Sequence, residues 1–257
     1  MAEGISAILH GDSKAGKSTA AYTAPAPRLL LDAEAAHRWL PGRKVFWDPI
    51  TQAPPEAPVM GEDGQLNWET CVVIVRSWAT FVRAYEWLNT GQHPFTSVII
   101  DSVTEIQVKI KEEITGGNLE QKLQFDGWDK MLVRIETLCR NFRDLTEHPT
   151  QPIKAVILTA MTEYRDGKWR PYIQGSGSKK LPYFFDMIGY VYREKIVDPY
   201  DPTVPPRIAH RVLTGFDANI IAGERINGLL KEEHKIPPIV ENINFETILQ
   251  NAAEALA

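Results

Sequence analysis

Residues Gly11–Thr19 read Gly-Asp-Ser-Lys-Ala-Gly-Lys-Ser-Thr and follow a short stretch, Ile5–Leu9, in which apolar residues alternate. Gly11–Ser18 matches the pattern G-x-x-x-x-G-K-[ST], whose backbone N–H groups surround a phosphate chain. Its glycines let the loop turn tightly and keep side chains away from the phosphates. The preceding stretch predicts a buried strand, and Lys17 to about Thr23 predicts a helix whose N-terminal end faces the same phosphates. A nucleotide-binding loop between a strand and a helix is therefore expected.

Two side chains of this loop have expected roles in binding ATP and Mg²⁺. Lys17 would supply a cation to the β- and γ-phosphates, and the Ser18 hydroxyl would be a hard oxygen ligand for Mg²⁺. The residues expected to surround the nucleotide are Gly11, Asp12, Ser13, Lys14, Ala15, Gly16, Lys17, Ser18 and Thr19.

Further apolar runs and amphipathic segments alternate along the chain. This alternation predicts one α/β domain over residues 1–257, built on a doubly wound, mostly parallel sheet. The predicted strands after the first are Arg28–Asp32, Cys71–Val75, Ser97–Asp101 and Lys154–Met161. The predicted helices are Ser77–Asn89 with Ser77 as its N-cap, Thr104–Ile114 and Phe125–Glu147.

Three segments depart from this alternation. Residues 41–69 are rich in Pro, Gly and acids, which indicates a surface insertion or a contact loop with one short strand at Lys44–Trp47. Residues 162–215 predict a hairpin turning at Asp166–Gly167, followed by antiparallel edge strands. Residues 244–257 predict a terminal helix with Asn244 as its cap.

Composition and charge exclude several classes of protein. The formal net charge of −5 argues against coating duplex DNA by bulk electrostatics, although a local basic groove stays possible. Cys71 and Cys139 form no CxxC pair, so neither a structural disulfide nor a zinc site is expected. No signal peptide and no apolar run of membrane-spanning length is found. We expect a soluble, cytoplasmic protein without a membrane partner.

Acidic residues follow two of the predicted strands at their carboxyl ends. Asp101 comes directly after a buried run, where doubly wound folds bind ligands, and is the candidate partner of Mg²⁺. Glu34 is the candidate to accept a proton from the water that attacks the γ-phosphate. Asp32 is its rival for this role, and both could instead be solvated loop acids.

Basic and aromatic residues concentrate after the fifth predicted strand. Aromatic faces beside cations suit single-stranded nucleic acid, because bases stack and phosphates need cations. The alternative is a solvated hairpin with an exposed loop. The candidate DNA-loop residues are Arg165, Lys168, Trp169, Arg170, Lys179 and Lys180, with Tyr172 and the flexible stretch 175–178 between them.

Asp32-Ala33-Glu34 and the stretch Val98–Val103 resemble the corresponding motifs of RecA-type recombinases. The layout of residues 4–230 resembles the compact phage RecA-like ATPases, which include single-strand annealing proteins. The resemblance implies that Glu34 is the general base and Asp101 the acid that organises Mg²⁺. It also implies a sensor position at Thr159, between the γ-phosphate and the DNA loop.

The resemblance carries further expectations about assembly. It implies that Lys179 and Lys180 reach an ATP in the neighbouring subunit. It therefore also implies a homo-oligomeric ring or filament with nucleotide at the interface. Single-stranded DNA is the implied partner, with a single-strand binding protein as a further candidate. A phage-encoded protein of this family would work in the cytoplasm of an infected bacterial host.

Two other functions remain open on the sequence. A small-molecule kinase could use the same loop, with the region 165–180 as its lid. A nucleotide-gated loader or assembly ATPase of a replication or packaging machine could bind a protein partner through the Pro-rich segment Pro41–Asn67.

Overall fold

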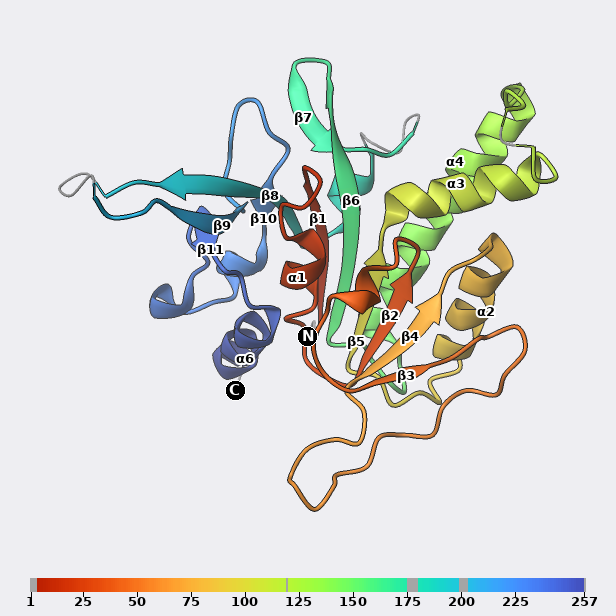
Figure 1. The fold of residues 1–257 in the computed structure, drawn as a ribbon, viewed down its shortest axis with the longest axis horizontal. Helices are drawn as coiled ribbons and strands as arrows, with labels where there is room; N and C mark the ends of the chain where they lie inside the picture. The colour runs from red at the N-terminus through yellow and green to blue at the C-terminus, as the bar shows by residue number, and fades with distance from the viewer. Residues whose placement is uncertain (1–3, 119, 175–179, 199–202, 257) are drawn as a thin grey trace.

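The computed structural model describes residues 4–118, 120–174, 180–198 and 203–256 of the chain. Lys179 and residues 175–178 of the predicted DNA loop lie outside these ranges. The described residues form an 11-stranded mixed sheet with helices on both faces, as Figure 1 shows. The predicted α/β fold with a mostly parallel sheet is confirmed.

Seven neighbouring strands run parallel in the order β8-β1-β6-β5-β2-β4-β3. Strand β1 carries the nucleotide-binding loop, and β6 separates it from β5, which ends at Asp101. Because all seven strands point the same way, their polar carboxyl ends meet at one edge of the sheet. These strands are β1 (Ile5–Gly11), β2 (Arg28–Asp32), β3 (Lys44–Phe46), β4 (Thr70–Ile74), β5 (Ser97–Asp101), β6 (Ala155–Arg165) and β8 (Met187–Ile196).

Alternate residues of the buried strands feed two separate cores. Ile8 of β1 faces a core shared with three helices, while Ala7 and Leu9 face the other core, under the shorter helices. The first face is covered by α2 (Trp78–Leu88), α3 (Val103–Ile114) and α4 (Phe125–Asp144); the second by α1 (Lys17–Ala21) and α6 (Phe245–Leu256) (Figure 1).

The helix termini follow the expected capping chemistry. The Ser77 hydroxyl accepts a hydrogen bond from the N–H of Thr80, and Asn244 Oδ1 accepts one from the N–H of Thr247. The predicted N-caps of α2 and α6 are thereby confirmed. None of the helices among the described residues is long and apolar enough to cross a bilayer.

The antiparallel part of the sheet begins later than expected. Strand β8 pairs parallel with β1 and only its other side is antiparallel, to β9 (Arg207–Leu213) and β10 (Gly223–Glu224). Strand β11 (Ile239–Glu241) then pairs with β9. Apolar and polar residues alternate along β8 because this strand continues past its partner β1. Beyond β1 it pairs with β9 as an exposed two-stranded ribbon.

The β6–β7 hairpin extends from the carboxyl end of the sheet and stands clear of it in Figure 1. Strand β7 (Lys168–Pro171) returns after the turn at Asp166 and Gly167, both of which have positive φ. Two positive φ angles are typical of a type I′ turn. Two-residue hairpin loops favour this turn because its twist matches the right-handed twist of the flanking strands.

The insertion predicted at 41–69 is partly built into the sheet. Lys44–Phe46 forms β3, the edge strand beside β4, and the rest of the segment is irregular on both sides of it. The long loop that follows is closed by a bridge between Met60 and Leu66 and by an ion pair of 2.6 Å between Arg43 and Asp63.

Short 3₁₀ turns complete the described structure: η1 (Ala36–Arg38), η2 (Leu145–Glu147), η3 (Leu181–Phe184), η4 (Ile226–Gly228) and η5 (Glu232–His234). The predicted long helix Phe125–Glu147 therefore ends in a 3₁₀ turn after Asp144.

Candidate functional site

The loop between β1 and α1 depends on its two glycines. A Cβ atom on Gly11 would lie 2.1 Å from the carbonyl oxygen of Val191, because β8 runs directly beside the loop. Gly16 has a φ of +107° and stands against the ring of His210, 3.0 Å from where its Cβ would be. Both positions therefore require glycine in this structure.

Lys17 folds back over its own loop. Its Nζ donates hydrogen bonds to the carbonyl oxygens of Gly11 at 2.9 Å and Asp12 at 2.8 Å. Burial lowers the pKa of Lys17, while Glu34, Asp101 and Asp12 oppose this shift. The ammonium is therefore held inside the loop next to several carboxylates, where an entering triphosphate would replace the carbonyl partners.

Asp101 lies buried at the end of β5 beneath the loop. Its carboxylate accepts a hydrogen bond from the Thr159 hydroxyl, and the nearby Ser18 hydroxyl acts to lower its pKa. Its second oxygen, Oδ2, is buried and has no hydrogen-bond partner among the described residues. Burial is the main reason that the pKa of Asp101 is raised. An unpaired carboxylate oxygen beside a serine hydroxyl fits a Mg²⁺ site, since this ion takes hard oxygen ligands and keeps several waters.

The structure separates the two candidate acids after β2. The Asp32 carboxylate accepts hydrogen bonds from the backbone N–H groups of Glu34, Ala36 and His37 and from His37 Nδ1. Asp32 therefore holds the turn after β2. Glu34 instead lines the cavity over the loop, and its Oε1 accepts a hydrogen bond from the Ser102 hydroxyl.

The cavity over the loop has a volume of about 440 Å³. Met161, Thr162 and His210 line it together with Glu34 and most of the predicted loop residues. Ala15 is buried beneath it. Thr159, the predicted sensor, is not among the lining residues; its hydroxyl donates to Asp101, and Thr162 of the same strand lines the cavity.

Two histidines contribute to the site without any signal in the loop motif. His210 of β9 donates from Nδ1 to the carbonyl oxygen of Ala15 at 3.0 Å. His10, one residue before the loop, donates from Nε2 to the carbonyl oxygen of Ile221 at 2.8 Å and accepts at Nδ1 from Thr162 at 3.2 Å. Burial lowers the pKa of His10 to about 4, so the ring is neutral.

A comparison with protein families identifies a domain that covers most of the chain. A family model described as an AAA domain matches residues 3–218. The chain belongs to this AAA domain family. The matched range contains the loop, Glu34, Asp101 and the β6–β7 hairpin, so the AAA domain carries a nucleotide-binding site of the P-loop ATPase type. No curated protein sequence matches the chain.

The β6–β7 hairpin of the AAA domain carries most of the predicted DNA-loop residues. Arg165, Lys168 and Trp169 lie at its tip, and the rings of Trp169 and Tyr164 are 5.1 Å apart across the two strands. Arg170 differs from the expectation, because its side chain is buried and its Nη2 donates to the carbonyl oxygen of Arg165 at 2.8 Å. Arg170 therefore stabilises the hairpin and is not presented to a ligand.

Lys180 of the AAA domain forms an ion pair with Glu136 of α4, at 2.9 Å between Nζ and Oε1. The structure thus gives Lys180 a partner within its own chain. Lys179 lies outside the described residues.

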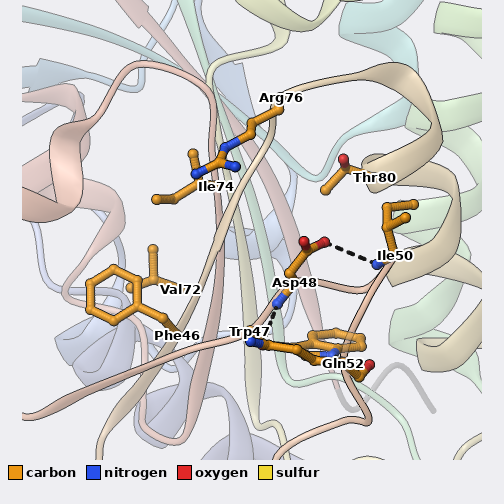
Figure 2. Close-up of a pocket in the computed structure, with 9 residues that line it drawn as sticks. All are labelled: Phe46, Trp47, Asp48, Ile50, Gln52, Val72, Ile74, Arg76 and Thr80. Atoms are coloured by element: carbon orange, nitrogen blue, oxygen red, sulfur yellow. Dashed lines mark hydrogen bonds between the residues drawn. The ribbon is translucent and has the colours of Figure 1, made fainter.

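A separate cavity of about 310 Å³ lies at the β3 edge and shares no lining residue with the cavity over the loop. Figure 2 shows its apolar side, made by Phe46, Val72 and Ile74, with the Arg76 side chain alongside Ile74. Asp48 closes the turn opposite, where it accepts from the N–H of Ile50 at 3.0 Å. The insertion thus builds a second, partly apolar surface on the AAA domain.

Proposed function

We propose that the protein binds ATP with Mg²⁺ at Gly11–Thr19, hydrolyses it, and acts on single-stranded DNA as a RecA-like recombination or annealing protein of a phage. The observation that carries the proposal is the position of Glu34. Its carboxylate lines the cavity over the loop, opposite Lys17, and the competing Asp32 is fully engaged in a turn.

Three side chains of this site would perform the hydrolysis. Lys17 neutralises charge that develops on the phosphates, and Glu34 accepts the proton of the attacking water. The Ser102 hydroxyl donates to Glu34 and holds its carboxylate in place. Ser18 and Asp101 would hold Mg²⁺, which supplies further charge neutralisation to the phosphates.

The cavity has few cations for this task. Lys14 and Lys17 line it, and none of its lining residues in the described ranges is an arginine. ATPases of this kind need a further cation at the transferring phosphate, supplied either by the same chain or by a neighbour. This supports a homo-oligomer, ring or filament, in which Lys179 or Lys180 of one subunit reaches the ATP of the next.

The DNA part of the proposal is supported by the shared strand β6. Met161 and Thr162 line the cavity, and the same strand continues to the hairpin with Tyr164 and Trp169 exposed. Bases stack on aromatic rings with little sequence preference, and the adjacent Arg165 suits the phosphates. A shift of Met161 or Thr162 on nucleotide binding or hydrolysis would be passed to the hairpin along β6 alone.

The test is ATP hydrolysis by the purified protein with and without single-stranded DNA. Lys17→Ala should abolish nucleotide binding, whereas Glu34→Gln should keep binding and lower turnover about 10²–10⁴-fold. The double variant Tyr164→Ala/Trp169→Ala should lose stimulation by DNA but keep basal turnover. Phe125→Ala, an exposed aromatic on α4, is the matched control and should behave as wild type. Full turnover in Glu34→Gln would contradict the base assignment.

A mixing experiment tests the neighbour's cation. Glu34→Gln is inactive at its own site, and Lys179→Ala/Lys180→Ala should be inactive at the site of its neighbour. Mixed oligomers contain some interfaces with an intact Glu34 and intact lysines, so mixing should restore part of the turnover that both variants lack alone. Failure to recover activity on mixing, with oligomers formed, would exclude a role in trans.

Other results would point to the remaining functions. ADP production only in the presence of a small acceptor would indicate a kinase. Binding of ATP without DNA stimulation would favour the loader, with the β3-edge cavity around Phe46 and Ile74 as the surface to test for a protein partner.

A further inference from the structure

A smaller cavity of about 220 Å³ adjoins the cavity over the nucleotide-binding loop. Gly16, Thr19 and His210 line both cavities, so the two spaces meet at the start of α1. The smaller cavity continues between α1, the strands β8 and β9, and residues 242–244. A triphosphate in the first cavity would therefore border the second cavity.

The walls of the smaller cavity suit a flat heterocycle. Val191, Val212 and Ile243 supply apolar surface, and Asn242 supplies an amide at the rim. Ligand pockets commonly combine apolar walls with a few placed polar groups. The Asn242 side chain has no hydrogen-bond partner among the described residues, so both its donor and its acceptor are available.

The backbone fixes where this amide stands. Asn242 adopts a φ of +54°, and its N–H donates to the carbonyl oxygen of His210 at 3.0 Å. Three residues on, the N–H of Phe245 donates to the Thr23 hydroxyl at 3.0 Å, which ties the segment to the turn that follows α1. Residues 242–244 at the rim of the cavity are therefore held in place by the turn after α1, the helix that follows the nucleotide-binding loop.

His210 stands where the two cavities meet. Its Nδ1 faces a carbonyl oxygen, which can only accept, so Nδ1 donates and Nε2 is left for another partner. No hydrogen bond joins Nε2 to another of the described residues. A hydroxyl group between a phosphate chain and a base fits this nitrogen, because a hydroxyl can both donate and accept.

We propose that the smaller cavity receives the nucleoside half of the triphosphate, with the base between Val191, Val212 and Ile243, the base edge at Asn242, and the ribose at His210. This inference rests on the proposed nucleotide binding and adds the residues that read the base. Residues 242–244 lie beyond the range 3–218 that the AAA domain family model matches. The base would then be read by a segment outside the matched domain.

Calorimetric titration with ATP and with inorganic tripolyphosphate separates the two halves of the site. ATP should bind wild type at least about tenfold more tightly than tripolyphosphate does, because the nucleoside adds contacts. Asn242→Gly keeps a residue that tolerates positive φ but removes the amide. It should weaken ATP about tenfold and leave tripolyphosphate within about twofold. Ala20→Phe, which fills the cavity from α1, should act in the same direction more strongly.

Control variants and outcomes keep this test separate from the proposed function. Asn118→Gly, in the turn after α3, should bind both ligands as wild type does. Retained tripolyphosphate binding shows that a variant is folded. Equal affinity of wild type for the two ligands, or unchanged ATP binding in both Asn242→Gly and Ala20→Phe, would overturn the inference alone. Failure of wild type to bind either ligand would overturn the proposed function with it.

Discussion

Replacement of His10 by Gln should reduce the dependence of stability on pH. The imidazole is fully buried on β1, and burial lowers its pKa from 6.5 to about 4. Gln can still donate to the carbonyl oxygen of Ile221, as Nε2 of the histidine does, but it does not titrate. The substitution therefore removes a titrating group and keeps its main hydrogen bond.

The sign and size of the effect follow from proton linkage. Between pH 6.5 and about 4 the unfolded chain binds a proton at His10 that the folded chain does not, so folding weakens as the pH falls through this window. Above pH 6.5 the full contribution of the neutral His10 to the unfolding free energy is present. Between about pH 7 and about pH 5, wild type should lose about 2 kcal/mol more unfolding free energy than His10→Gln.

Urea unfolding at both pH values, followed by circular dichroism, measures this difference directly. His93 is also buried with a lowered pKa, but it contributes equally to both proteins and cancels in the comparison. An equal loss of stability in wild type and His10→Gln would show that His10 is not held neutral by the fold. The Lys17 ammonium also lowers the pKa of His10. Lys17→Ala should therefore slightly narrow the pH range over which His10 affects the unfolding free energy.

Three further changes test the packing around the site. Gly11→Ala should cost about 1–3 kcal/mol of unfolding free energy and weaken ATP binding, since its Cβ would meet the Val191 carbonyl; unchanged urea midpoints would contradict this. Asp101→Asn should raise thermal stability without nucleotide, because it removes a buried charge, and should weaken Mg²⁺-dependent ATP binding by calorimetry. Phe245→Ala should cost about 3–5 kcal/mol by urea unfolding, because its ring is fully buried beside α1.

The sequence was most informative where function depends on local chain geometry. The loop Gly11–Ser18 carries its own pattern, because successive backbone groups and two side chains do the binding. Strands β5 and β2 were predictable from their short apolar runs, which precede Asp101 and follow Arg28. Strands that are buried on both faces have few polar positions. The hairpin turn at Asp166–Gly167 was predictable because few residue pairs tolerate two positive φ angles.

Contacts between distant segments were not predictable in this way. His210 and Asn242 reach the site from the far end of the chain, and nothing in their local sequence shows which loop they face. Strand β8 was expected to be antiparallel because its pattern alternates, but pairing direction depends on the connection to β1. The basic and aromatic composition of the hairpin favours Arg170 as a ligand for DNA, but its side chain is buried, because burial inside a hairpin depends on the cross-strand neighbours.

The support of the nucleotide-binding loop by late segments has a consequence for synthesis on the ribosome. The loop leaves the exit tunnel well before the residues that support it, because His210 bonds to Ala15 across 195 positions and Phe245 to Thr23 across 222. Chain segments fold during translation as their partners emerge, and contacts of such long range form slowly. The nascent chain would therefore present an incomplete loop until Phe245 has emerged, and ATP could not assist folding before that point.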